Sequence, residues 1–398
     1  MADVKNFLNE KEKRNQNQRD YQEKIRRHRL VNVSRVALIA VIIIVLVTLV
    51  IIQRRNHIYS DYDIVNSVQR EKASGATDLA MKDAVLTYSR DGAHCTDIKG
   101  NITWNQTYEM QDVKLDICRD VVAIGNYNGR EIYVQSTGKI LGKITTNLPI
   151  KNLAVAQNGN VTAILEDTDT TWINTYSPDG TAIYNGQTHM HNSGYPCAVS
   201  LSPNGELLGV SFLFVEAGVL KTNVAFYNFG AVGENKSDHL VSTFSYSDLI
   251  VPEIHFMDNS TAFAVGDSRL MIYAGGQKPV SVKECLFERE ILSVFYSERY
   301  IGLVFGADNV DNQYMIEVYN ASGERVNKTY FDLDYRNIFF EQDGFVVYNE
   351  RECEVYSMKG KQKYKGSFSK SLNLMLPTSA AYRYIVVTDN SIDTVQLK

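Results

Sequence analysis

Short runs of almost continuous apolar residues recur along the chain beyond residue 120. They are Val121–Gly125, Val161–Glu166, Leu207–Phe212, Thr261–Gly266, Tyr300–Gly306, Phe345–Asn349 and Tyr384–Asp389. Runs of this length, rich in β-branched and aromatic residues, are typical of strands that are covered on both faces. No amphipathic helical pattern lies between them, which excludes the helical repeat folds. This part of the chain is therefore expected to be all-β.

A second signal recurs with the same period, namely a strand with an aromatic end followed by a turn glycine. The turn glycines are Gly100, Gly138, Gly180, Gly230, Gly275, Gly323 and Gly360. Subtracting neighbouring positions gives spacings of 38, 42, 50, 45, 48 and 37. That period fits one four-stranded propeller blade and is too long for a leucine-rich or ankyrin repeat. We expect these glycines to supply the positive φ of tight turns.

The strand pattern gives a count of blades. Seven complete blades fall at 75–110, 112–146, 149–190, 194–246, 250–288, 290–332 and 334–369. Residues 371–398 hold three further strands, and the alternating segment Asp61–Glu71 has no blade of its own. Pairing Asp61–Glu71 with the C-terminal strands would close the ring and remove its exposed sheet edges. The sequence thus predicts a propeller over 61–398 with eight four-stranded blades, or seven if 371–398 only extends an edge.

The longest apolar run precedes the propeller. Val36–Ile52 reads VALIAVIIIVLVTLVII and carries no charge. At ~1.5 Å per residue, a helix over this run would span ~25 Å, close to the ~30 Å hydrocarbon core of a bilayer. Five basic residues lie just before it, at Lys24, Arg26, Arg27, Arg29 and Arg35, whereas Arg54 and Arg55 follow it. This charge imbalance predicts a single-pass membrane protein with a cytoplasmic tail at 1–35, a span at 36–52, a linker at 53–60 and an extracytoplasmic propeller.

Composition narrows the possible functions. The net charge of −5 argues against nucleic-acid binding, which requires a basic surface. The five cysteines, Cys95, Cys118, Cys197, Cys285 and Cys353, are far apart and odd in number, so we expect free thiols rather than disulfides or a zinc site. Motifs of hydrolases, metalloproteases and nucleotide-binding proteins are absent from the sequence. No catalytic, cofactor-binding or metal-binding residue is predicted.

Three weaker features remain. His189 and His191 have a spacing that could hold a metal, but no third ligand lies nearby in the sequence. The favoured interpretation is therefore two histidines in a loop between blades, without a metal. The acidic loops 166–169 and 308–311 lack regular calcium-loop spacing and are interpreted as solvated turns. Longer connections occur at LFVEAGVLKTN and GAVGENKSDHL in the blade at 194–246, and at GADNVDNQ in the blade at 290–332. Because loops carry recognition more often than framework strands, a binding face is expected there.

Several segments in order carry a family resemblance across almost the whole chain. They are SDYDIV (60–65), YSRDGA (88–93), WNQTYEMQ (104–111), NSGYP (192–196), VAFYNFG (224–230) and SVFYSERYIGLVF (293–305). With the basic tail and the apolar anchor, they resemble an uncharacterised family of membrane-anchored proteins from Gram-positive bacteria. The turns SPDG and SPNG and the steps GNITW and GKQKY are similar to those of quinoprotein-like and WD40-like propellers. The resemblance implies fold and location but no activity.

These patterns favour a binding or scaffolding module at the outer face of the cell membrane, with a protein or an envelope glycan as partner. The alternative is an enzyme, either a quinone-dependent oxidoreductase or a hydrolase, whose site would lie at the propeller channel. That alternative predicts titratable side chains gathered in one pocket with perturbed pKa values. A one-pass signalling role is least favoured, because the tail is short and contains no recognisable domain.

Overall fold

The computed structural model describes residues 21, 38–48, 57–168, 170–188, 194–236 and 238–398. The chain divides into two compact units, Met1–Ile58 and Tyr59–Lys398. In the first unit, residues 38–48 are helical and exposed. Among the described residues, no helix is both long and apolar enough to cross a membrane. Residues 36–37 and 49–52 of the expected span lie outside the described part of the chain.

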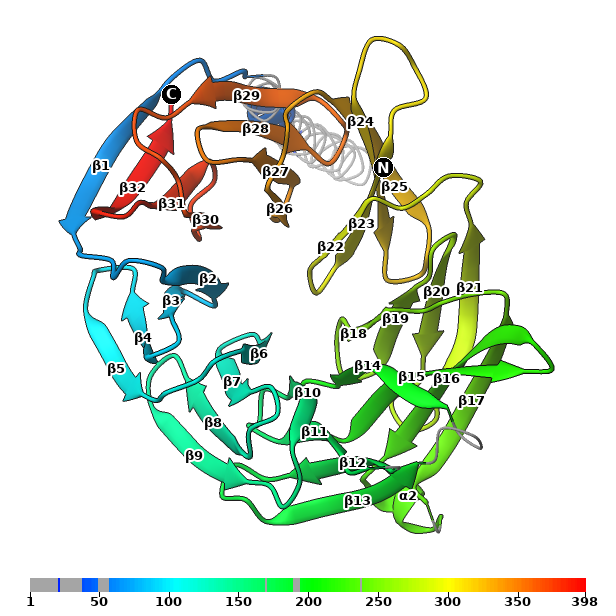
Figure 1. Ribbon diagram of the computed structural model, residues 1–398. Helices are drawn as coiled ribbons and strands as arrows, with labels where there is room; N and C mark the ends of the chain where they lie inside the picture. The colour runs from blue at the N-terminus through cyan, green and yellow to red at the C-terminus, as the bar shows by residue number, and fades with distance from the viewer. Residues whose placement is uncertain (1–20, 22–37, 49–56, 169, 189–193, 237) are drawn as a thin grey trace, which may run out of the picture. The chain divides into compact units, whose positions relative to one another are not determined.

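The second unit contains eight four-stranded antiparallel sheets, which are arranged around a central opening (Figure 1). Blades 1 to 4 contain β2 (Thr77–Met81), β3 (Ala84–Tyr88), β4 (Gly92–Asp97) and β5 (Ile102–Thr107); β6 (Val113–Cys118), β7 (Val121–Asn126), β8 (Glu131–Ser136) and β9 (Ile140–Thr145); β10 (Ile150–Val155), β11 (Val161–Glu166), β12 (Thr171–Tyr176) and β13 (Ala182–Thr188); and β14 (Tyr195–Leu201), β15 (Leu207–Glu216), β16 (Val219–Asn228) and β17 (Leu240–Ser247). A four-residue helix, α2 (Ala231–Glu234), lies between β16 and β17.

Blades 5 to 7 contain β18 (Glu253–Phe256), β19 (Thr261–Val265), β20 (Arg269–Ala274) and β21 (Val280–Leu286); β22 (Ser293–Tyr296), β23 (Tyr300–Gly306), β24 (Tyr314–Asn320) and β25 (Arg325–Phe331); and β26 (Asn337–Phe340), β27 (Gly344–Tyr348), β28 (Glu352–Ser357) and β29 (Gln362–Ser367). Blade 8 contains β30 (Leu374–Pro377), β31 (Arg383–Val387), β32 (Ser391–Leu397) and β1 (Tyr62–Gln69). The eight four-stranded blades predicted from the sequence are confirmed, and the seven-blade alternative is wrong. The first strand of each blade faces the centre.

Apolar side chains pack between the blades. The described residues form eight buried apolar clusters, one at each junction of neighbouring blades. The second strand of each blade contributes to clusters on both sides, as Phe345 and Val346 of β27 do. This two-sided burial explains why the second strands read as continuous apolar runs rather than as alternating ones.

Turn geometry corrects one expectation. Five of the turn glycines have the positive φ that the sequence predicted, namely Gly100, Gly180, Gly275, Gly323 and Gly360. Gly138 and Gly230 do not. Gly230 has an extended backbone, with φ −90° and ψ −172°, because it precedes the first residue of α2. Gly138 lies in an open bend between β8 and β9 that does not require the left-handed region.

Blade 8 closes the ring by joining the two ends of the propeller sequence. β1 pairs antiparallel with β32 in a register that runs from Tyr62 opposite Leu397 to Gln69 opposite Ser391. Ser67 of β1 donates a hydrogen bond to the buried carboxylate of Asp393 on β32. The expected strand within Asp61–Glu71 therefore supplies the outer strand of the last blade.

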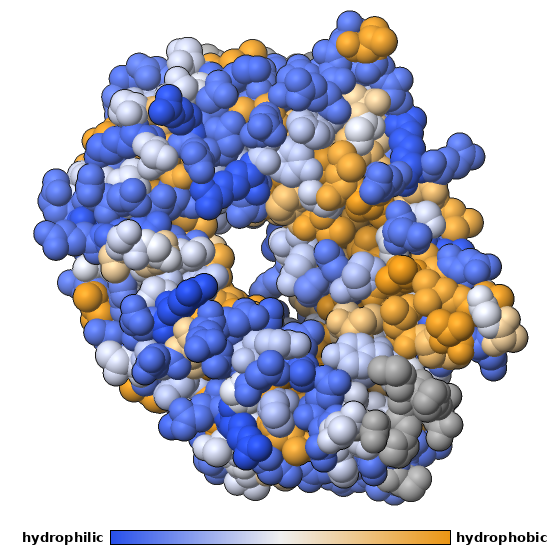
Figure 2. Space-filling view, in the orientation of Figure 1, coloured by the Kyte–Doolittle hydropathy of each residue, from blue (hydrophilic) through white to orange (hydrophobic). Residues whose placement is uncertain are grey.

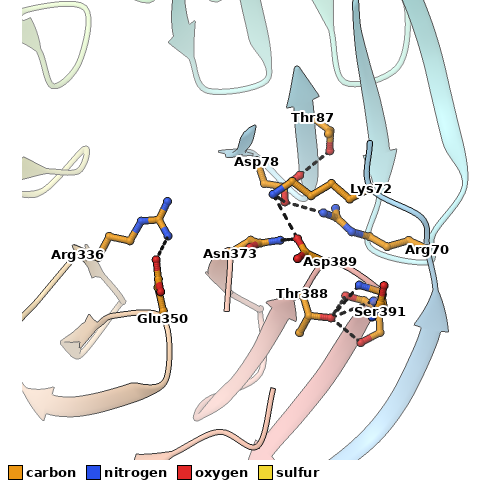
Figure 3. A network of polar contacts seen from close by, with 11 residues as sticks. Arg70, Lys72, Asp78, Thr87, Arg336, Glu350, Asn373, Thr388, Asp389 and Ser391 are labelled. Atoms are coloured by element: carbon orange, nitrogen blue, oxygen red, sulfur yellow. Dashed lines mark hydrogen bonds and ion pairs between the residues drawn. The ribbon is translucent and has the colours of Figure 1, made fainter. Parts of the chain in front are cut away.

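The junction between blades 8 and 1 is unusually polar. Its apolar cluster has six buried residues, the fewest of the eight clusters in the described part of the chain. Figure 3 shows Arg70 and Lys72 converging on the carboxylate of Asp78. The Arg70 and Lys72 nitrogens lie 2.6 and 3.3 Å from Asp78 Oδ2, and the Thr87 hydroxyl donates to its other oxygen at 2.7 Å. Ionic contacts thus take the place of part of the apolar packing at this junction.

Candidate functional site in the central channel

A cavity of about 530 Å³ lies where the first strands of the blades end near the centre of the ring. We call it the channel cavity; its lining includes residues from seven blades. Apolar side chains such as Met81, Leu201 and Met257 make up much of its wall. Figure 2 shows the opening at the centre of the ring as a hollow between the blades. Cavities of this size accommodate small organic molecules or single side chains.

One carboxyl group projects into this wall. Asp116 occupies the middle of β6, and its Oδ2 accepts a hydrogen bond from the backbone N–H of Val155 on β10 at 2.7 Å. In the described part of the chain, no cationic side chain forms an ion pair with this carboxylate. Desolvation raises the pKa of Asp116 from 3.8 to about 6, although backbone hydrogen bonds act against the shift. Asp116 is therefore a carboxylate at neutral pH that lacks a positive partner.

An aromatic pair lies on the other side of the cavity. The imidazole of His255 on β18 stacks on the phenol ring of Tyr296 on β22, with centroids 4.3 Å apart and planes at 27°. Desolvation lowers the pKa of His255 from 6.5 to about 4, so the ring is neutral at pH 7. Desolvation first, and then the neighbouring Asp116 carboxylate, raise the pKa of the Tyr296 phenol above 10. Tyr296 nevertheless keeps 44% of its surface exposed and lines the channel cavity.

An ion pair crosses the mouth of the cavity. Arg119 Nε lies 2.7 Å from Glu298 Oε1, and the Arg119 guanidinium also donates to the Gln157 side chain at 2.7 Å. Arg119 follows β6 in blade 2, and Glu298 follows β22 in blade 6. Blades 2 and 6 are four apart in a ring of eight, so this contact joins opposite walls. Because both side chains are partly exposed, the pair contributes little stability, on the order of 1 kcal/mol or less.

The channel cavity meets one expectation of the enzyme alternative, since titratable groups with perturbed pKa values gather there. A nucleophile paired with a base is missing from its described lining. Burial raises the pKa of the Cys118 thiol to about 11, which keeps it protonated and unreactive at neutral pH. His255 Nε2 lies 3.8 Å from Glu253 Oε2, beyond hydrogen-bond distance. These groups line a cavity in which they can contact a ligand.

The buried imidazole makes a prediction about acid stability. Because the folded pKa of His255 lies below its ordinary value, its stabilising contribution is present above about pH 6.5 and is lost as the pH falls towards 4. The loss amounts to roughly 1–3 kcal/mol, allowing for the partial exposure of the ring. His255→Phe should keep the stacking on Tyr296 and remove this loss. Unfolding free energies of both chains, measured by denaturant titration at neutral and acidic pH, test the difference.

The neighbouring carboxyl groups of Asp116 and Glu253 change the stability with pH in the direction opposite to His255. Burial raises the folded pKa of Asp116 and of Glu253, so their contributions are present at low pH and are lost as the pH rises. For Asp116 the loss occurs between about pH 4 and pH 6. The wild-type curve alone therefore mixes opposing effects, and only the difference between wild type and His255→Phe isolates the imidazole. If the difference in unfolding free energy between wild type and His255→Phe is the same at neutral and acidic pH, the loss of stability in acid does not come from His255.

A second candidate surface lies on the opposite face of the propeller. β15 and β16 run beyond their neighbours, because β14 pairs only as far as Leu213 and the pairing with β17 begins at Lys221. Residues 214–220 thus form a two-stranded projection that we call the hairpin extension. Its turn residues Ala217 and Gly218 have φ of +52° and +78°, as a two-residue hairpin turn requires. Val215 is 67% exposed, and Figure 2 shows apolar side chains gathered on this side of the ring.

The longer connections expected to carry recognition take different forms in the structure. LFVEAGVLKTN is not a loop but the paired hairpin extension, because its alternating residues continue the ladder of β15 and β16. GAVGENKSDHL contains α2 and precedes β17. GADNVDNQ connects β23 to β24 and exposes Val310 completely. Second-to-third-strand connections all lie on one face of a propeller whose blades are antiparallel, so Val310 and the hairpin extension share a face.

The carboxylates of Glu166 and Asp308 in the two acidic loops pair with basic side chains. The Asp308 carboxylate is bound by Arg289 and Lys328, each at 3.0 Å, and by the Tyr330 hydroxyl at 2.6 Å. These contacts lower its pKa and leave it neutralised rather than open to a cation. Glu166 pairs with Lys151 at 3.1 Å. Asp169, His189 and His191 lie outside the described residues. The five cysteines are free thiols; Cys95 and Cys353 are buried and the other three are half-buried.

The fold and the cavity define a propeller with a ligand-sized central cavity. The chain belongs to the family of unknown function DUF5711, whose sequence profile matches residues 54–397. The expected membership of an uncharacterised propeller family is thereby confirmed; membrane anchoring and bacterial origin stay predictions. No functionally curated protein matches the chain.

Solved propellers are similar in fold. Sqt1 from Chaetomium thermophilum has a TM-score of 0.53 at 12% identity, with 85% of this chain and 100% of that chain covered. BamB from Moraxella catarrhalis has a TM-score of 0.48 at 13% identity, with 85% and 100% covered. Kluyveromyces lactis Hsv2p has a TM-score of 0.48 at 10% identity, with 74% and 98% covered. The likeness to Sqt1 supports the propeller fold and carries no information on partners.

Proposed function

We propose that this protein is a membrane-tethered, extracytoplasmic propeller that binds a protein partner through the face carrying the hairpin extension. The observation that carries the proposal is the hairpin extension itself, a paired ribbon that projects beyond its blade and exposes aliphatic side chains. Val215 and Val219 at its tip are 67% and 36% exposed. Contiguous exposed apolar side chains on a folded domain mark interaction surfaces.

The chemistry of this face favours a protein over an envelope glycan. Its exposed apolar residues include the valines Val215, Val219 and Val310, which suit contact with apolar protein side chains. Glu216 and Lys221 form an ion pair beside them. A polar rim around an aliphatic centre is the usual composition of a protein–protein contact.

Tethering rests on the sequence of Val36–Ile52 and on the basic residues that precede it. The propeller begins at Tyr59, whose backbone N–H donates to Lys363 O at 2.7 Å next to the start of β29. β1 starts beside the end of β32, on the face opposite the hairpin extension. The propeller therefore begins on the face away from the hairpin extension.

Val215→Lys tests this proposal. The full chain, tagged and recovered from membranes, should enrich a specific protein partner, and the substitution should reduce that enrichment by about tenfold or more, as expected for a charge placed in an apolar contact. Ile140→Lys is the matched control, because Ile140 is 57% exposed at the start of the outer strand β9 in blade 2, on the face away from the hairpin extension. Equal recovery by both variants, or recovery of a wall polymer in place of a protein, would contradict the proposal.

A further inference from the structure

We propose that the channel cavity binds an organic cation, namely a primary ammonium or guanidinium group on an apolar stem, through the carboxylate of Asp116 and the ring face of Tyr296. The site is separate from the proposed partner face and does not depend on it. The same chemistry is offered by a free amine and by a lysine or arginine side chain of a bound protein.

The unmatched charge of Asp116 is the first reason. Its carboxylate faces the channel cavity and accepts a backbone N–H at 2.7 Å, and no cation among the described residues lies within ion-pair distance. Arg119 lines the same cavity but is held by Glu298 and Gln157, each at 2.7 Å. Lys82 is exposed at the rim and forms no ion pair with Asp116. A partly buried carboxylate without a cationic partner is costly, and a bound cation would offset that cost.

The aromatic wall is the second reason. His255 stacks on Tyr296, and Phe263 contacts the same ring in a T-shaped arrangement with centroids 5.4 Å apart, yet Tyr296 stays 44% exposed and lines the channel cavity. A cation over a tyrosine ring in a partly desolvated site gains roughly 1–2 kcal/mol. The carboxylate and the ring thus offer the two contacts that bind an ammonium or guanidinium head.

The remaining lining indicates an organic cation rather than a metal ion. Across the described part of the chain, no three side chains of the metal-binding types come together. Met81, Leu201 and Met257 instead offer an apolar wall for a hydrocarbon stem. The volume of about 530 Å³ accommodates a small amine or the end of one long side chain.

Asp116→Asn separates ligand binding from a structural role. Asn keeps an oxygen that can accept the Val155 N–H, but it has no charge, so the fold should be retained. Calorimetric titration of the full chain with benzylamine should show binding that weakens about tenfold or more in Asp116→Asn. Benzyl alcohol, which has the same shape without the charge, should bind the wild type at least tenfold more weakly than benzylamine. Tyr296→Leu should weaken benzylamine binding several-fold, and Asp267→Asn, at an exposed turn on the other face, should leave it unchanged.

A second arm identifies the source of the cation. An N-acetylated, C-amidated Gly-Lys-Gly peptide is titrated in the same way. Binding of benzylamine alone supports a free amine as ligand, and binding of the peptide supports a partner's side chain. The proposal is overturned if neither probe binds, if Asp116→Asn binds both as wild type does, or if benzyl alcohol binds as tightly as benzylamine.

Discussion

A chain that begins at Arg70 is expected to melt far below a chain that begins at Tyr59. Both lack the N-terminal unit, but only the longer one keeps β1, which forms the outer strand of blade 8. Removing β1 deletes its ladder with β32 and the ring contact of Tyr62 with Phe368, whose centroids are 4.9 Å apart. At roughly 0.5–1.5 kcal/mol for each lost hydrogen bond, the expected loss is on the order of 5 kcal/mol. Differential scanning calorimetry of the two chains measures it.

The comparison isolates residues 59–69, because both chains keep Arg70 and therefore its ion pair with Asp78. The side chains of β1 are mostly exposed, so the loss comes from backbone pairing rather than from an emptied core. The edge of β32 is left open in the shorter chain, which should make that chain prone to aggregation. A synthetic peptide of residues 59–69 should restore the melting temperature by adding the missing strand. Equal melting of the two chains would show that the ring does not depend on β1.

Asp78→Ala is expected to destabilise the propeller by about 3–5 kcal/mol, because it leaves the Arg70 guanidinium at a buried site without its counter-charge. The Asp78 side chain is fully buried, and the Arg70 side chain is only 12% exposed. Arg70 Nε already lacks a hydrogen-bond partner within the described residues, so the guanidinium depends on this carboxylate. Chemical denaturation monitored by circular dichroism gives the change in unfolding free energy.

Asp389→Ala is the control, since Asp389 also contacts Lys72, at 3.5 Å, but its side chain is 67% exposed. That substitution should cost at most about 1 kcal/mol. Replacing both partners, as in Arg70→Met with Asp78→Leu, should recover much of the stability lost in Asp78→Ala, because no unpaired charge is then buried. Similar losses in Asp78→Ala and Asp389→Ala would mean that the polar junction does not stabilise the ring.

The blade count could be predicted because propeller geometry repeats along the chain. Each second strand is buried on both faces and so reads as an apolar run, as at Tyr300–Gly306. The closure of the ring by β1 could also be predicted, because the alternating segment Asp61–Glu71 had no blade of its own. The form of the long connections could not be predicted, since a hairpin that lengthens its strands and a loop of equal length have similar composition. The backbone of the hairpin extension becomes evident only from its pairing register.

The channel cavity could not be found from spacing along the sequence. Asp116, His255 and Tyr296 come from blades 2, 5 and 6, and the ring alone brings them together. A weak signal was present. Asp116 interrupts the run VKLDIC, and His255 stands in EIHF, each a titratable group in the first strand of a blade. Those strands face the channel. A titratable residue in one of them is therefore a candidate for ligand contact.

The pairing of β1 with β32 also dictates the order of folding. Tyr62 pairs with Leu397, so the earliest strand of the propeller stays without its partner until residue 397 has been synthesised. Closing a loop of that length is slow and depends on contacts far apart in sequence. Blades 1 to 7 are each contiguous and can form in turn, whereas blade 8 assembles only after β32 has been synthesised. Loss of β32 therefore leaves an open ring rather than a smaller one.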